Sequence, residues 1–145
     1  MSMRRSSALS PAALVFAGAT AYNSVIAVRE DLPGEPLGFG LPLSVATGTL
    51  AGWGSAVAAP WPMPVVGLLA ARRRGQDKEE FGPGLICTGL GIAGIVGILI
   101  EPNTYRAREW APATRRAVVL HIGACAVLAG AGVWEIARAR RERGK

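Results

Sequence analysis

A small set of polar and ionisable side chains lies within or beside otherwise apolar stretches, and these residues carry the chemistry that the sequence offers. The set comprises Tyr22, Asn23, Ser44, Thr47, Glu101, Arg106 and His121. Glu101 and His121 are the pair that could exchange a proton. Arg106 could pair with Glu101 or recognise an acidic headgroup. If the fold brings these residues together, they form a small polar pocket.

Two interpretations of this set stay open at the level of the sequence. Polar groups at membrane depth usually face the protein interior and find partners there. Asn23 and His121 could therefore bond to each other or to Thr47 and hold helices together, each contact contributing about 0.6 to 2 kcal/mol. The other interpretation is a pocket open to the outer leaflet, in which Glu101 and His121 act on a bound molecule.

Four apolar stretches must position these residues. They are Ala8–Val28, Leu41–Ala71, Phe81–Ile100 and Ala117–Ile136, and half of the 145 residues are apolar. Each stretch is long enough to cross a bilayer, whose ~30 Å hydrocarbon core needs about 20 helical residues. The sequence predicts an all-α fold, a small integral membrane four-helix bundle forming a single transmembrane domain over 1–145. The expected spans are 8–28, 41–59, 81–100 and 117–136, followed by a basic tail at 137–145.

The second stretch is too long for one upright span, because residues 41–71 would form a helix of ~46 Å. It contains Pro60, Pro62 and Pro64, and each proline biases the residue before it away from helical geometry. We expect a span at 41–59, a proline-rich break and a short interfacial helix at 65–74. A single kinked helix over 41–71 is the alternative, since neighbouring helices can satisfy backbone groups freed by proline.

The distribution of arginine predicts how the chain is threaded. The net charge is +6, and basic residues gather before the first stretch, between the second and third, and in the tail. Cytoplasmic segments are enriched in Lys and Arg. We therefore expect a multi-pass protein of a bacterial inner membrane with both termini in the cytoplasm. Residues 1–21 also resemble a cleavable signal peptide ending in Ala19-Thr20-Ala21, so both a retained span and a cleaved signal stay open.

Small residues recur at four-residue spacing within the predicted spans. Those expected to mediate helix packing are Gly48, Gly52, Gly89, Ala93, Gly97, Ala126 and Gly130. This spacing stacks small side chains on one helix face and allows a partner helix to approach closely. The partner is either another helix of the same chain or a helix of a second copy.

Other sequence patterns argue against several functions. Residues 89–94 match G-x-G-x-x-G, but they lie inside an apolar stretch with no polar approach for a dinucleotide. Cys87 and Cys125 are expected about 10 Å apart in depth, beyond the reach of a disulfide. No spacing of Cys and His indicates a metal site, and no cofactor is expected. Because the basic residues flank apolar spans, anionic lipid headgroups at the cytoplasmic face are the expected partners, and nucleic acid is not.

Two functions remain for the chain. The first is a non-enzymatic accessory or scaffold protein that acts through helix packing and loops, with other membrane proteins or a second copy as partners. The alternative is a lipid- or small-molecule-handling protein, either a transporter or an isomerase-like enzyme, that uses the polar pocket in the outer leaflet. An enzymatic activity is the less favoured of these, because no motif specifies a reaction.

Overall fold

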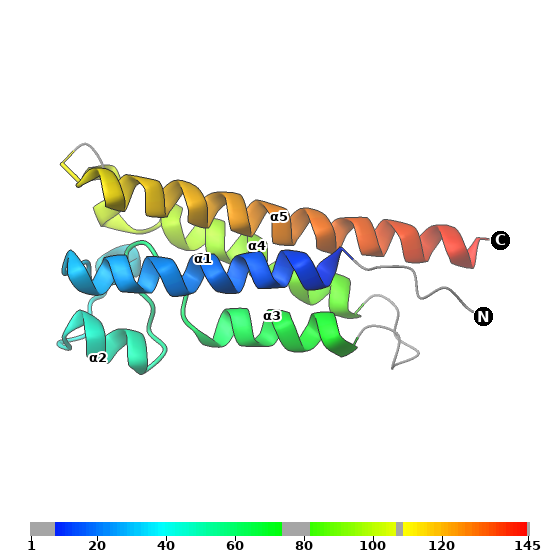
Figure 1. Cartoon of the computed structure of the whole chain (residues 1–145), viewed down its shortest axis with the longest axis horizontal. Coiled ribbons are helices and arrows are strands. Elements are labelled where there is room, and N and C mark those ends of the chain that lie inside the picture. Colours follow the sequence, from blue (N-terminus) through cyan, green and yellow to red (C-terminus); the bar gives the residue numbers. More distant parts are fainter. Residues whose placement is uncertain (1–7, 74–81, 107–108, 145) are drawn as a thin grey trace.

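The computed structural model describes residues 8–73, 82–106 and 109–144, with the side chain of residue 106 left out. The described residues form helices joined by irregular segments, which confirms the predicted all-α class (Figure 1). In chain order the elements are α1 (Leu9–Arg29), η1 (Pro36–Gly38), α2 (Val45–Leu50), α3 (Pro62–Arg73), α4 (Gly82–Leu99), η2 (Pro102–Arg106) and α5 (Pro112–Arg143), where η denotes a short 3-10 helix.

Three of these helices, α1, α4 and α5, are long and apolar enough to cross a membrane. They present large apolar side chains outward, and Leu14, Leu85, Ile92, Val119 and Val133 are each more than half exposed. Soluble proteins rarely expose so much contiguous apolar surface, whereas a bilayer accommodates it. These properties support a helical membrane protein.

The helices α1, α5, α4 and α3 pack against one another in cyclic order. The start of α1 and the ends of α3 and α5 lie at one end of the molecule, which we call the terminal end (Figure 1). Helix α2, η1 and η2 lie at the opposite end, the loop end (Figure 1). The core between the helices consists mostly of small side chains, with Phe16, Leu9 and Leu128 as its largest members.

Helices α4 and α5 approach closely because glycines face each other across their contact. A Cβ atom at Gly91 would collide with the carbonyl oxygen of Cys125 and lie 2.7 Å from the backbone nitrogen of Ala129. A Cβ atom at Gly132 would lie 2.5 Å from the carbonyl oxygen of Gly84. Such backbone proximity is typical of membrane helices, where packing replaces the hydrophobic effect as the main source of association.

The small residues on α4 and α5 that the four-residue spacing singled out do not lie at the contact between these two helices. Cβ atoms built at Gly89, Gly97 and Gly130 would meet nothing within 4 Å. Ala93 and Ala126 are exposed. Within the chain, therefore, these residues do not carry the helix packing that their spacing predicted, because they face outward while Gly84, Gly91 and Gly132 face the partner helix.

The predicted span at 41–59 is not a continuous helix, which corrects the sequence-based boundaries. Helix α2 ends after Leu50, and an irregular segment at 51–61 follows it. Gly52 and Gly54 interrupt the helix, because they adopt φ values of +84° and +85°. Glycine enters this left-handed region without the steric cost that other residues bear. Gly52 thus makes a turn rather than a helix contact, while Gly48 is buried, and a Cβ atom built on it would lie 4.0 Å from the Cβ of Trp53.

The helix after the prolines also differs from the prediction. Helix α3 begins at Pro62, and its prolines at 62 and 64 occupy the first turn, where the missing N–H removes no helical hydrogen bond. It packs against α1 and α4 and runs alongside them instead of lying across the end of the bundle (Figure 1). Residues 41–71 therefore form neither the continuous helical span expected at 41–59 nor one kinked helix.

Candidate functional site

A cavity of about 230 Å³ lies between α4 and the irregular segment at 51–61. Its principal lining residues are Ala58, Met63, Gly94, Gly97, Glu101 and His121. The space exists because the chain opposite this part of α4 is irregular. The α4 face there carries Ala93, Gly94 and Gly97, whose side chains are too short to fill it, beside the longer Ile98. The lining is therefore mostly apolar.

The cavity opens on the flank of the molecule. Ala93 and Gly97 at its rim are exposed, and Pro60 and Met63 are half-buried. Polar side chains lie deeper, because the exposed fractions of Glu101 and His121 are only 3% and 1%. A molecule entering the cavity would pass between α4 and the start of α3.

His121 on α5 is a buried polar side chain with a ring nitrogen that has no hydrogen-bond partner among the described residues. Its ring packs against Phe16 of α1, with ring centroids 6.1 Å apart. Nδ1 is buried and has no hydrogen-bond partner among the described residues. A Cβ atom on Gly94 would lie 3.4 Å from Nε2, so this nitrogen is directed towards the cavity side of α4. Buried polar groups are nearly always hydrogen-bonded, and an exception indicates strain, an unplaced molecule or a functional role.

Asn23 on α1 connects this helix to the irregular segment at 51–61 and to α5. Its Nδ2 atom donates to the carbonyl oxygen of Val57 at 2.9 Å and to that of Ala117 at 2.9 Å. The side chain is fully buried. It therefore holds α5 and the irregular segment against α1, and its bonds go to backbone carbonyls instead of to His121 or Thr47 as the sequence suggested.

Glu101 follows α4 and connects two loops at the loop end. Its Oε2 atom accepts a hydrogen bond from the backbone nitrogen of Glu35 at 2.9 Å, and Oε1 accepts from Nδ2 of Asn103 at 3.3 Å. The backbone nitrogen of Leu37 donates to the carbonyl oxygen of Ile100 nearby. These bonds fix the carboxylate at the cavity wall, so the fold brings the two predicted ionisable residues, Glu101 and His121, to one cavity.

Three other predicted pocket residues, Tyr22, Ser44 and Thr47, do not line this cavity. Ser44 and Thr47 are exposed and bond to each other, with Oγ atoms 2.8 Å apart, and the Ser44 side chain caps the start of α2. Tyr22 is 43% exposed on α1. The side chain of Arg106 is outside the described part of the structure, so its expected pairing with Glu101 stays a prediction.

Several residues that shape the cavity were not singled out from the sequence. Phe16 orients the His121 ring, Ala58 and Met63 form walls, and Gly94 leaves space beside the ring. The proline cluster did signal an irregular backbone near Met63. Nothing in the sequence indicated which face of α4 the irregular segment would leave uncovered.

No family model, curated protein or solved structure matches this chain. Among the described residues, no group of three or more His, Cys, Asp or Glu side chains could hold a metal ion. Cys87 and Cys125 are buried and free. The function is therefore inferred from the geometry of the cavity itself.

Proposed function

We propose that the chain is a membrane-embedded binding protein. The cavity between α4 and the segment at 51–61, which we call the flank cavity, takes a small, mostly apolar molecule with one hydrogen-bonding group. The observation that carries this proposal is His121, which lines an apolar cavity with Nε2 on the cavity side and has no partner at its buried Nδ1. A neutral imidazole offers one donor and one acceptor, so a hydroxyl or carbonyl group on the ligand would complement it. Pockets of this kind combine apolar walls with a few polar groups that fix orientation.

We further propose that the loop end faces the outer leaflet and that both termini are cytoplasmic. The support is the basic sequence at the terminal end, where Arg72, Arg73 and the last turn of α5 gather. In this arrangement the stretch at 41–73 provides a fourth crossing. Its irregular part is tolerable at membrane depth because Gly54 and residues 56–59 are buried in protein.

The ligand would reach the cavity from the lipid phase. The rim residues Ala93 and Gly97 lie on α4, whose outward face carries Ile92 and Val96 for contact with lipid. An apolar molecule already partitioned into the bilayer needs no aqueous path to such an opening. Binding, without a chemical step, is therefore the activity that we assign to this cavity.

Replacing His121 with phenylalanine tests the proposed polar contact. The new ring keeps the packing against Phe16 but has no nitrogen atoms. We expect the amount of apolar molecule that co-purifies in mild detergent to fall about tenfold, as for loss of one hydrogen bond in an apolar site. Solvent extraction and mass spectrometry of the purified protein measure that amount.

The thermal midpoint of the same variant separates binding from structural support. Because Nδ1 has no protein partner, its removal should leave the midpoint unchanged or slightly raised. A clear fall in the midpoint with unchanged ligand content would show that His121 serves only to hold the helices together. Absence of any co-purified molecule from the unaltered protein would also contradict the proposal.

The outward small residues on α4 and α5 support a second candidate function, that of an accessory or scaffold protein. Gly89 and Gly97 on α4 and Gly130 on α5 have open space around them, so the backbone of a partner helix could approach there. A second copy or another membrane protein would be the partner. This candidate requires a protein complex, whereas the binding function is complete in a single chain.

A further inference from the structure

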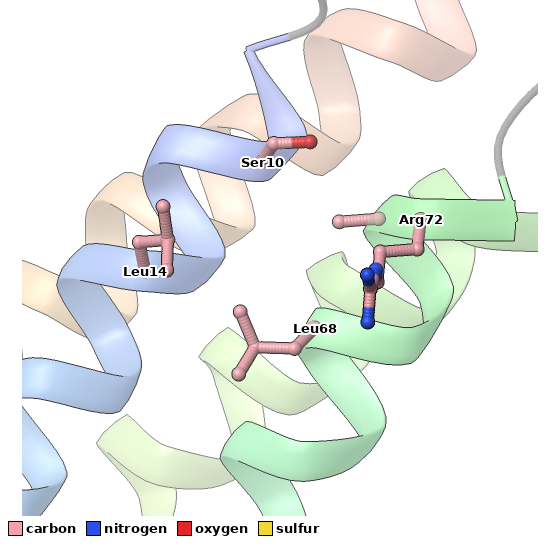
Figure 2. Close-up of a pocket in the computed structure, with 5 residues that line it drawn as sticks. Ser10, Leu14, Leu68 and Arg72 are labelled. Carbon is pink, nitrogen blue, oxygen red and sulfur yellow. The ribbon is translucent and has the colours of Figure 1, made fainter.

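A second, separate groove of about 340 Å³ lies at the terminal end, between α1 and α3. Figure 2 shows Ser10 and Leu14 projecting from α1, and Leu68 and Arg72 projecting from α3. Ala71 completes the lining. This groove shares no residue with the cavity beside His121.

The groove is divided into a polar level and an apolar level. Helices α1 and α3 run antiparallel, so Ser10 lies near Arg72 and Leu14 lies near Leu68 (Figure 2). On each helix the leucine is four residues from the polar residue, which places it one turn, or about 6 Å, further from the terminal end. A molecule lying along the groove therefore meets a hydroxyl and a guanidinium first and apolar side chains next.

We propose that this groove binds one anionic phospholipid, with the phosphate at Arg72 and Ser10 and an acyl chain along Leu14 and Leu68. The charge of the site complements an anion, because Arg72 and its neighbour Arg73 are both exposed in the last turn of α3. A guanidinium presents a planar set of donors that matches phosphate oxygens.

The apolar part of the groove selects a lipid over a free anion. Leu14 is 62% exposed and lies on a helix that is apolar enough to cross the membrane, so its surroundings are acyl chains. The polar level lies at the end of that helix, at the depth of lipid headgroups. The groove thus matches a phospholipid in both chemistry and depth.

The test compares two neighbouring arginines. Arg72 lines the groove and Arg73 does not, although both are exposed at the same helix end. Native mass spectrometry would measure retention of phosphatidylglycerol and of phosphatidylcholine with the same acyl chains. We expect one tightly held phosphatidylglycerol on the unaltered protein, about fivefold weaker retention in Arg72→Gln, and nearly unchanged retention in Arg73→Gln.

Three results would overturn the proposal. Equal weakening by Arg72→Gln and Arg73→Gln, or equal retention of both lipids, would show diffuse attraction or purely apolar contact. Displacement of the lipid by equimolar sn-glycerol 3-phosphate would show that the leucines contribute nothing and that the site takes free phosphate. Because both arginines are exposed, each variant should keep the thermal midpoint of the unaltered protein, which confirms that the fold is intact.

Discussion

Replacing Gly91 with alanine should lower the thermal midpoint by about 10 °C, the largest effect that we expect from one added methyl group. The Cβ atom would collide with the carbonyl oxygen of Cys125 and approach the backbone nitrogen of Ala129 at 2.7 Å. Backbone atoms cannot rotate away as the end of a side chain can, so α4 and α5 must separate. Overpacking of this kind costs about 3 kcal/mol, which corresponds to the expected shift.

Gly89 provides the matched control on the same helix. A Cβ atom there meets nothing within 4 Å, so alanine at this position should leave the midpoint within a few degrees or raise it slightly. Thermal unfolding in detergent, followed by circular dichroism, measures both variants. Equal midpoints for Gly91→Ala and Gly89→Ala would mean that α4 and α5 do not pack through Gly91.

Replacing Asn23 with leucine should lower the midpoint by about 5–10 °C. The change removes both hydrogen bonds from Nδ2, which hold the carbonyl oxygens of Val57 and Ala117 at 2.9 Å. Leucine has the same branching and number of heavy atoms, so the loss comes mainly from the buried carbonyl oxygen of Val57, since that of Ala117 lies within the continuous helix α5. An unsatisfied buried polar group costs about 1–3 kcal/mol. Because Val57 adjoins the cavity wall at Ala58, ligand retention should fall as well.

Ser24 on the next position of α1 is the control for Asn23. Its hydroxyl donates only to the carbonyl oxygen of Thr20 within the same helix, so Ser24→Ala breaks no contact between segments. Its midpoint should change by no more than about 2 °C. If Asn23→Leu unfolds at the temperature of Ser24→Ala, then Asn23 does not anchor the irregular segment.

The long apolar stretches at 8–28, 81–100 and 117–136 were predictable because uninterrupted hydrophobicity dominates every other signal along them. Helices α1, α4 and α5 cover these stretches except Ala8 and Ile100 at their ends and Phe81, which is outside the described residues. The stretch at 41–59 is also apolar and carries no charged residue, and hydropathy alone therefore predicted a helix there. The left-handed φ values at Gly52 and Gly54 prevent a continuous helix. The sequence did not single out these two glycines, because the chain contains many others.

The burial of the polar residues was predictable, but their partners were not. Asn23 and His121 are both buried between the helices, and Glu101 reaches the same cavity as His121. The bonds of Asn23 go to backbone carbonyls, and every residue carries a carbonyl, so no side-chain pattern could identify which ones. Likewise, four-residue spacing marked Gly89 and Gly97, whereas the choice of the Gly91 face depends on how α5 lies against α4.

Native mass spectrometry of Gly97→Leu, released from mild detergent, most directly tests whether the flank cavity holds an apolar molecule. Gly97 lies at the rim with open space around it, so leucine can enter the cavity without disturbing helix contacts. Gly89→Leu adds the same side chain to α4 outside the cavity. We predict bound mass on the unaltered chain and on Gly89→Leu, and its loss from Gly97→Leu. Equal bound mass on all three proteins, or a dimer that carries no small molecule, would contradict the binding function.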